Sequence, residues 1–273
     1  MRIAIKILIL TIGLFLTSCE DVIDVDLDTA APRLVIDASI DWERNTIGNE
    51  QKIKLSTTTG YYSNEFPIVS GATITVSNST GNIFNFIETS IAGEYICTDF
   101  IPEIGETYTL TINLNGEIYT AMETLIETAN IEDNIDQSNS GGITGDEIEI
   151  TYYYQDNVNE ENYYLHRTIT PHVAFPEFRA GNDEFSQGNL ISESYSNEDL
   201  NIGDNVNIKL YGISRRYYEY FNKLILASGG DTGPFPSTPV AVRGNIINQT
   251  NFNNFAFGYF RLCEVDVKDY TLQ

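Results

Sequence analysis

The chain has 273 residues, and 39 Asp and Glu outnumber 15 Lys and Arg, so its formal net charge at neutral pH is −24. A surface this acidic repels the phosphate backbone of nucleic acids and anionic lipid headgroups, which excludes nucleic-acid binding. The hydrophobic content of 42% is that of a globular protein, so the acidic residues decorate a folded surface and do not signal disorder.

Residues 1–18 have the order of a secretory signal peptide. Two basic residues near the start give a positive head, residues 7–16 are an almost unbroken apolar run, and the small residues Thr17 and Ser18 precede Cys19. The apolar run is about half of the roughly 20 residues that a membrane-spanning helix needs. We therefore expect a cleaved export signal and not a membrane span.

The residues before the cleavage point, Leu-Thr-Ser-Cys at 16–19, resemble the lipobox of bacterial lipoproteins. In that family the cysteine thiol is acylated, the chain is cut before the cysteine, and the new amino end is acylated as well. The resemblance implies a mature chain that begins at a lipidated Cys19, held stably at a membrane because it carries more than one acyl chain. The alternative is a plain secretory signal that is cleaved elsewhere.

An acidic tether follows the cysteine. Five of the nine residues in 20–28 are Asp or Glu, so we expect residues 19–32 to be extended and solvated. An acidic run at this place resembles the surface-export signal of Bacteroidota lipoproteins, which implies an outer-membrane protein that faces the outside of the cell. The alternative is a solvated acidic run that does not act as an export signal.

Residues 33–128 have the twofold periodicity of β-strands. In 107–114 every even position is apolar and every odd position is polar, which is typical of a half-buried strand. Asn115-Gly116 follows, and this pair favours a type I′ hairpin turn, which needs positive φ at both positions. We predict an antiparallel β-sandwich of immunoglobulin or fibronectin type. Its seven strands are predicted at 34–40, 51–57, 72–76, 83–87, 94–98, 107–114 and 117–125.

A second β-rich domain is predicted over 147–273. It is separated from the sandwich by a linker at 129–146, where the stretch 131–145 almost lacks large apolar residues. Runs rich in Tyr, Ile, Val and Thr predict its strands. These are expected at 147–155, 163–174, 204–212, 240–247 and 255–267.

One helix is predicted at about 214–227. Ser214 is a suitable N-cap, and Tyr217, Phe221, Leu224 and Ile225 follow at a spacing that places them in one apolar stripe. The predicted fold is therefore mainly β, a sandwich followed by a β-rich domain with one α-helix.

Two cysteines, Cys97 and Cys263, remain after Cys19. In an oxidising compartment they could pair as a disulfide. The alternative is two separate buried thiols that behave as small apolar residues.

Several segments together resemble the Bacteroidota lipoproteins that share a domain of unknown function, number 4249. The resemblance spans nearly the whole mature chain and implies an outer-membrane lipoprotein that accompanies TonB-dependent transporters. It implies no catalytic residue. The segments that carry it are 19–23, 32–36, 71–76, 93–95, 234–236, 244–246 and 257–260.

The chain shows no linear motif for catalysis, nucleotide binding or zinc. His166 and His172 are the two histidines, and their even separation predicts one face of a strand, where we expect ordinary strand residues. The stretch 199–205 is faintly similar to a calcium loop, but its residue order departs from that of an EF-hand. We therefore predict no enzyme activity, no metal and no cofactor except the lipid on Cys19, with calcium as the alternative.

Tyrosines supply the candidate contacts to a ligand or partner. Neighbouring strand residues face opposite sides, so some of the clustered tyrosines must leave the core, and we expect Tyr153, Tyr164 and Tyr218 to be available for a glycan or a protein. Tyrosines with solvated hydroxyls at a sheet edge are the alternative.

These features favour a surface-exposed accessory lipoprotein that binds a TonB-dependent transporter barrel or its ligand without catalysis. A carbohydrate-binding or adhesion lipoprotein is the second hypothesis. A lipid-anchored hydrolase is the third hypothesis, and it would need a catalytic site that no motif in the sequence indicates.

Overall fold

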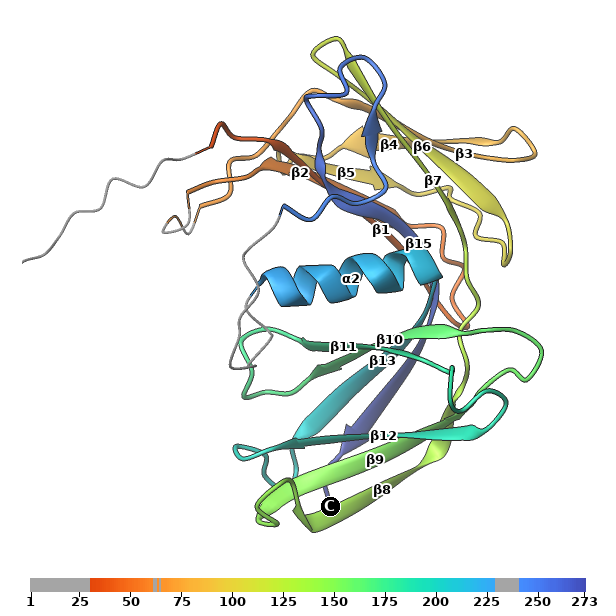
Figure 1. Ribbon diagram of the computed structural model, residues 1–273, viewed down its shortest axis with the longest axis vertical. Coiled ribbons are helices and arrows are strands. Elements are labelled where there is room, and N and C mark those ends of the chain that lie inside the picture. Colours follow the sequence, from red (N-terminus) through yellow and green to blue (C-terminus); the bar gives the residue numbers. More distant parts are fainter. Residues whose placement is uncertain (1–29, 61–62, 64, 229–240) are drawn as a thin grey trace, which may run out of the picture. The chain divides into compact units, whose positions relative to one another are not determined.

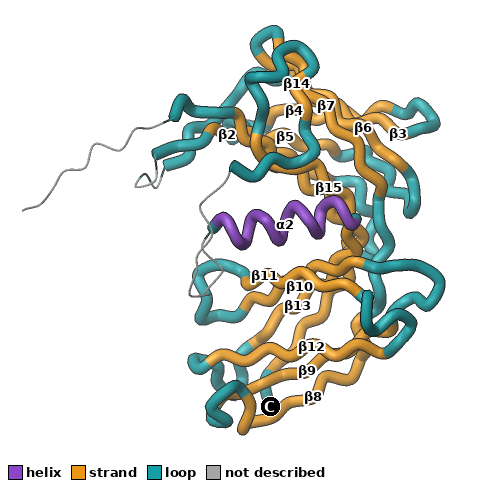
Figure 2. Tube along the Cα trace, viewed as in Figure 1, coloured by secondary structure: helices purple, strands orange, loops and turns teal. Residues whose placement is uncertain are grey.

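The computed structural model describes residues 30–60, 63, 65–228 and 241–273. The predicted signal peptide 1–18, the lipidation site Cys19 and nearly all of the predicted tether 19–32 lie outside the described residues. The described chain is mainly β, as predicted, and its single helix is α2 (Figures 1 and 2).

The N-terminal strands form where the alternation predicts them. Along β6 the even-numbered residues are buried and the odd-numbered ones are more exposed. Asn115 and Gly116 have φ of 51° and 82° and join β6 to β7, so the hairpin prediction is confirmed. The strands are β1 (Leu34–Glu43), β2 (Gln51–Thr57), β3 (Thr73–Asn78), β4 (Ile83–Glu88), β5 (Glu94–Cys97), β6 (Thr107–Leu114) and β7 (Glu117–Thr124).

The predicted linker at 129–146 is wrong, because Ile131–Gly141 forms strand β8. This strand pairs antiparallel with β9 (Glu147–Gln155) and is an edge of a three-stranded sheet. Only Ile131 and Gly141 of β8 are buried. Backbone hydrogen bonds to β9 hold a polar edge strand in place, and such a strand needs few apolar side chains. Composition alone therefore could not separate it from a loop.

The C-terminal half contains further strands. β10 ends at Ile169 and not at 174, and the short strands β11 and β12 were not predicted. Of the predicted strand at 240–247, residue 240 lies outside the described residues, and only Ile247 and its neighbour Asn248 form a strand. The remaining strands are β10 (Tyr163–Ile169), β11 (Glu177–Asn182), β12 (Leu190–Asn197), β13 (Asn205–Ile213), β14 (Ile247–Asn248) and β15 (Phe257–Thr271).

The long strand β15 joins the two halves of the fold. It pairs parallel with β1, from Val35 opposite Phe257 to Glu43 opposite Val265, and antiparallel with β13. A continuous twelve-stranded sheet results, in the order β11-β10-β13-β15-β1-β2-β5-β4-β3-β6-β7-β14. The sheet thus runs across the boundary predicted between 33–128 and 147–273, and residues 32–273 form one compact unit.

Helix α2 (Arg215–Ala227) is confirmed close to its predicted limits. The Ser214 hydroxyl accepts a hydrogen bond from the backbone N–H of Tyr217 at 3.2 Å, which is the N-cap geometry expected. Tyr217 and Phe221 are buried in a core cluster that also contains Tyr259 of β15. Leu224 and Ile225 are about two-fifths exposed, so the buried stripe is narrower than predicted.

The cysteines do not form a disulfide with one another: Cys97 and Cys263 are free thiols, both buried. Cys97 belongs to the core of the sandwich, whereas Cys263 lies in the cluster under helix α2. Burial raises the pKa of the Cys97 thiol to about 11. The structure therefore shows the second alternative, two separate thiols in different cores.

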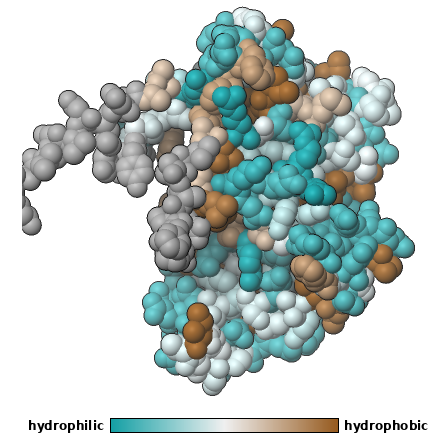
Figure 3. Space-filling model, in the orientation of Figure 1, coloured by the Kyte–Doolittle hydropathy of each residue, from teal (hydrophilic) through white to brown (hydrophobic). Residues whose placement is uncertain are grey.

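Hydrophilic residues cover much of the face seen in Figure 3, and hydrophobic residues form separate patches on it. Within the described ranges, no helix has both the length and the apolar composition that a membrane span requires.

Candidate functional site

The connection between the two halves is held by an ion pair between half-buried Arg44 and buried Glu264. Arg44 donates from Nε and Nη2 to the two carboxylate oxygens of Glu264, at 3.1 and 2.7 Å. Nη2 also donates to the Thr128 carbonyl at 2.6 Å, and the Thr128 backbone N–H donates to Glu264 at 3.1 Å. One carboxylate on β15 thus fixes both Arg44 and the chain that leads from β7 to β8.

Every guanidinium nitrogen of Arg44 has a hydrogen-bond partner in this arrangement. Its hydrogen bond to Glu264 raises the pKa of the guanidinium above its ordinary value, and Nη1 donates to the Asn130 side chain. A bidentate guanidinium–carboxylate pair of this kind is both strong and geometrically specific. Arg44 is therefore a structural residue and is not available to bind an anionic ligand.

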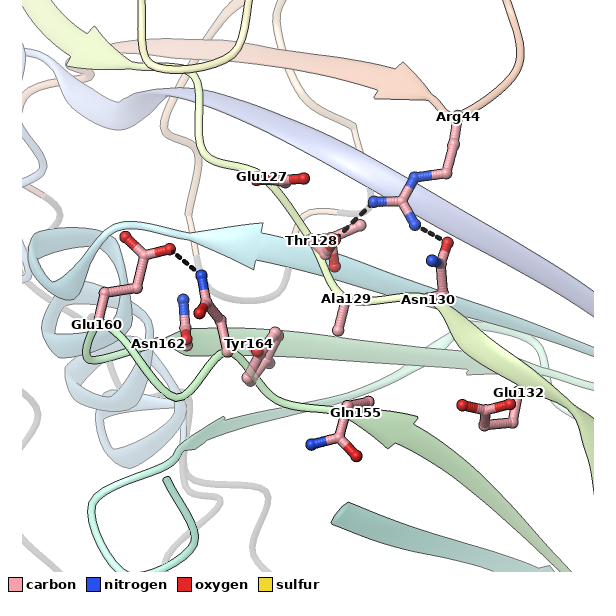
Figure 4. Close-up of a pocket in the computed structure, with 11 residues that line it drawn as sticks. Arg44, Glu127, Thr128, Ala129, Asn130, Glu132, Gln155, Glu160, Asn162 and Tyr164 are labelled. Atoms are coloured by element: carbon pink, nitrogen blue, oxygen red, sulfur yellow. Dashed lines mark hydrogen bonds between the residues drawn. The ribbon is translucent and has the colours of Figure 1, made fainter. Parts of the chain in front are cut away.

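Beside this ion pair lies a polar cavity of about 340 Å³ (Figure 4). Three carboxylates, those of Glu127, Glu132 and Glu160, contribute to its walls, and Glu160 accepts a hydrogen bond from the Asn157 side chain at 2.7 Å. With Arg44 neutralised, the cavity offers more acceptors than donors. Its lining residues are Arg44, Glu127, Thr128, Ala129, Asn130, Glu132, Gln155, Asn157, Glu160, Asn162 and Tyr164.

The three tyrosines predicted as contacts do not share a surface. Tyr164 is only 3% exposed and its hydroxyl donates to Asp156 at 2.7 Å, so the expectation of an available ring is wrong there. Tyr153 is half-buried and donates to Asp136 at 2.8 Å. Tyr218, also half-buried, packs against Tyr163 with ring centroids 5.2 Å apart.

The two histidines also lie apart. His166 is buried in β10, whereas His172 follows the end of that strand and its Nε2 lies 2.7 Å from Asp204. The prediction of one strand face is wrong because β10 stops at Ile169. Asp204 also accepts the Asn201 backbone N–H at 2.8 Å, which closes the turn at 199–205. Within the described ranges, no group of three or more His, Cys, Asp or Glu side chains is placed to hold a metal ion.

A second polar cavity, of about 370 Å³, surrounds His166. The His166 Nδ1 is 2.8 Å from the Tyr152 hydroxyl, and Nε2 has no hydrogen-bond partner among the described residues. Burial, aided by the nearby charge of Arg179, lowers the pKa of the imidazole to about 3, so the ring is neutral. The cavity is lined by Tyr152, His166, Thr168, Glu177, Phe178, Arg179, Ser194, Tyr195 and Ser196.

Sequence reasoning missed the charged residues of both places, Arg44 with Glu264 and Arg179 with Glu193. The members of each pair come from separate segments, so no linear spacing predicts them: Arg44 directly follows β1 and Glu264 lies on β15, whereas Arg179 and Glu193 lie on β11 and β12. The signal that could have found them is the scarcity of basic residues, 15 against 39 acidic ones, because each arginine then has many possible carboxylate partners.

The solved structures that match this chain are distant from it in sequence and in structure. A segment of two fibronectin type III domains from chicken tenascin is 11% identical, with a TM-score of 0.22 over 60% of this chain and 85% of that one. Bovine butyrophilin is 14% identical, with a TM-score of 0.23 over 66% and 92%. The FN1–FN3 domains of chicken CNTN1 are 13% identical, with a TM-score of 0.24 over 67% and 62%. Similarity at this level says nothing about activity.

No functionally curated protein matches this sequence. The sequence model of one protein family, described as a domain of unknown function (DUF4249), matches residues 20–269, which is nearly the whole chain. The resemblance to this domain of unknown function is thereby confirmed, and the chain belongs to the DUF4249 family.

Proposed function

We propose that this protein is a non-catalytic lipoprotein of the outer membrane, anchored by lipid on Cys19 and exposed at the cell surface, where it serves a TonB-dependent transporter as an accessory binding subunit. The observation that carries the proposal is the order of positive head, apolar run, small residues and cysteine at 1–19. The family match supports it, because it begins at residue 20, directly after the cysteine at which the leader would be removed.

The chemistry of the two cavities supports binding over catalysis. At each cavity an arginine is neutralised by a carboxylate, Arg44 by Glu264 and Arg179 by Glu193. Volumes of about 340 and 370 Å³ fall within the range of small-molecule sites, roughly 300–1,000 Å³. Polar walls with paired charges suit the recognition of a polar ligand without bond cleavage.

The anchor is tested by mass spectrometry of the full-length protein after expression in a bacterium with an outer membrane. We expect a mature chain that begins at an acylated Cys19, and loss of both acylation and membrane association in Cys19→Ala. Cys97→Ala is the matched control and should keep the lipid, since that thiol is buried in the sandwich. An unmodified Cys19 in the wild-type protein would refute the anchor.

The partner is tested by mild detergent extraction and affinity purification of the wild-type lipoprotein beside Cys19→Ala. A TonB-dependent barrel enriched only with the wild type supports the accessory role. Recovery of no such barrel argues against it. Surface exposure is tested separately: added protease should digest the protein on intact cells.

A second candidate function is carbohydrate binding or adhesion. It is favoured by Tyr163 and Tyr218, which pack together beside Arg215 and Glu219 on the wall of a third cavity, of about 290 Å³. Partly exposed aromatic rings with polar neighbours suit amphipathic ligands such as sugars. A glycan array on which the protein binds nothing would reject this function.

A further inference from the structure

The cavity around His166 lies where two sheet edges approach each other. Strand β11 is an edge of the twelve-stranded sheet, and β12 is an edge of the three-stranded sheet (Figure 1). Side chains bridge these edges: Arg179 contacts Glu193 at 2.5 Å and the Ser194 carbonyl at 3.2 Å, and the Tyr195 hydroxyl donates to Glu177 at 3.1 Å. Unpaired sheet edges bridged by side chains leave space between them, and here that space is the cavity of about 370 Å³.

His166 presents one unsatisfied nitrogen at this cavity. The residue is 3% exposed and its ring is fixed by the Tyr152 hydroxyl at Nδ1. Its Nε2 is buried, has no partner among the described residues, and lies 3.8 Å from a carboxylate oxygen of Glu193. That distance is too long for a direct hydrogen bond. An unpaired buried polar atom is costly, on the order of 1–3 kcal/mol, so its presence calls for a missing partner.

A hydroxyl group is the partner that fits both atoms. If the Tyr152 hydroxyl donates to Nδ1, the proton of the neutral ring is on Nε2, and Nε2–H needs an acceptor. Arg179 is paired with Oε2 of Glu193, and Oε1, which lies 3.8 Å from Nε2, can still accept a hydrogen bond. A hydroxyl between Nε2–H and Oε1 accepts from the first and donates to the second. A carboxylate or phosphate oxygen could accept from Nε2–H, but it has no proton to donate to Glu193 Oε1 and would bring two anionic oxygens into contact. An ammonium group has no lone pair for Nε2–H.

Other residues that line the cavity also favour a ligand with more than one hydroxyl group. Thr168 adds a side-chain hydroxyl, and Glu177, which accepts a hydrogen bond from the Tyr195 hydroxyl at 3.1 Å, adds a carboxylate. A single water molecule could also bridge His166 and Glu193, but it occupies only about 30 Å³ of liquid volume. The cavity therefore has room for a molecule that carries several hydroxyl groups.

We propose that this cavity binds a neutral polyhydroxylated ligand, a mono- or disaccharide, with one ligand hydroxyl held between His166 Nε2 and Glu193. This inference rests on the second candidate function for its class of ligand, but it places the sugar at the His166 cavity and not beside Tyr163 and Tyr218. It does not depend on the transporter partnership. Binding would give the buried His166 Nε2 a hydrogen-bond partner, so part of the affinity comes from relieving the free-energy penalty of leaving that atom unpaired.

The test is calorimetric titration of the full-length protein in lauryldimethylamine oxide, a detergent without a sugar headgroup. The probes are glucose, galactose, mannose, N-acetylglucosamine, maltose and lactose, with glucuronate as the anionic and glucosamine as the cationic comparison. We expect saturable binding of at least one neutral sugar, and at least tenfold weaker binding of its charged counterparts. Binding of none of the neutral sugars, or tighter binding of glucuronate, would overturn the proposal.

Two variants locate the binding. Glu193→Gln keeps the shape of the side chain and removes its charge. Gly181→Ala adds a methyl group 3.8 Å from His166 Nε2 that meets no other atom within 4 Å outside its own chain neighbours, so it narrows the cavity without a clash. Each should weaken sugar binding at least tenfold while the thermal unfolding midpoint shows that the protein folds. Unchanged affinity in both variants would place the sugar elsewhere and refute the assignment.

The matched control is His172→Gln, which removes the other histidine of the chain from the turn beside Asp204 and should leave sugar binding unchanged. Cys19→Ala separates this inference from the proposed anchor: it should abolish membrane association and leave the affinity for sugar intact. Failure to recover a transporter barrel would leave the result of the titration unaffected.

Discussion

Two groups of polar side chains differ in how completely they are paired: the Arg44 cluster, which contains Arg44, Thr128, Asn130 and Glu264, and the His166 cluster, which contains Tyr152, His166, Arg179 and Glu193. Arg44 gives hydrogen bonds to Glu264, Thr128 and Asn130, so its donors meet acceptors within the chain. His166 is paired only at Nδ1, and its other nitrogen is left without a partner among the described residues. The difference separates the roles of the two side chains: the Arg44 guanidinium holds the fold together, whereas His166 Nε2 is free to bind a ligand.

Position in the sheets explains this difference. Glu264 lies on β15, which has a paired strand on each side, so the backbone around it is fixed. Glu193 lies on β12, an edge strand, and faces β10 and β11 across a gap that only side chains bridge. Central strands thus hold the interior of the fold together, and the sheet edges leave space for a cavity.

The largest expected effect comes from breaking the Arg44 cluster. Glu264→Gln leaves the shape unchanged but removes the charge that neutralises Arg44, and we expect it to lower the free energy of unfolding by about 3 kcal/mol. Urea denaturation measures this. Glu219→Gln, in the exposed pair with Arg215, is the matched control and should leave the free energy of unfolding nearly unchanged. Equal losses in the two variants would contradict a structural role for Glu264.

Acid should weaken the His166 cluster by an intermediate amount. The folded pKa of about 3 lies below the ordinary 6.5, so the unfolded chain binds the proton more readily and stability is lost as the pH falls below 6.5. Between pH 7.5 and 5.0 this linkage costs on the order of 2 kcal/mol. Burial raises the pKa of Glu193, which faces the ring, and that shift acts in the opposite direction.

The measurement is the free energy of unfolding at both pH values for the wild type and for His166→Gln. The variant should lose less stability on acidification than the wild type does. His172→Gln should behave as the wild type. Identical pH dependence in His166→Gln and the wild type would show that the imidazole carries no such linkage.

The smallest expected effect is the loss of a single tyrosine hydroxyl, compared between a buried and an exposed position. Tyr164→Phe removes a buried hydrogen bond to Asp156, which should cost about 1.5 kcal/mol, since bonds to charged groups are worth about 1.5–3 kcal/mol. Tyr153→Phe removes an exposed bond to Asp136 and should lower the free energy of unfolding by less than Tyr164→Phe does. Thermal or urea unfolding compares them, and a reversed order would mean that burial does not control the strength of these bonds.

The parts of the fold that were predictable depend on neighbouring residues. The strand β6 follows from strict alternation, the turn at Asn115-Gly116 from the need for positive φ, and α2 from the cap at Ser214. In each case the physical cause lies within a few residues of its effect. Such causes are visible in the sequence.

The parts that were missed depend on distant residues. Strand β8 exists because β9 offers it hydrogen bonds, and β15 reaches β1 across more than two hundred residues. The same holds for the sites: burial of Tyr164 and the placing of Glu193 beside His166 arise only when separate strands pack together. The sequence shows the residue types, but not which of them meet.

The parallel pairing of β15 with β1 has a consequence for the order of folding. A chain that emerges from a membrane channel with its amino end first presents β1 long before residues 257–271 arrive. Until then one side of β1 is an unprotected edge, able to pair with other chains. Closing so long a loop is also entropically slow. Folding must therefore finish late, and a shortened chain that lacks β15 would be prone to aggregate.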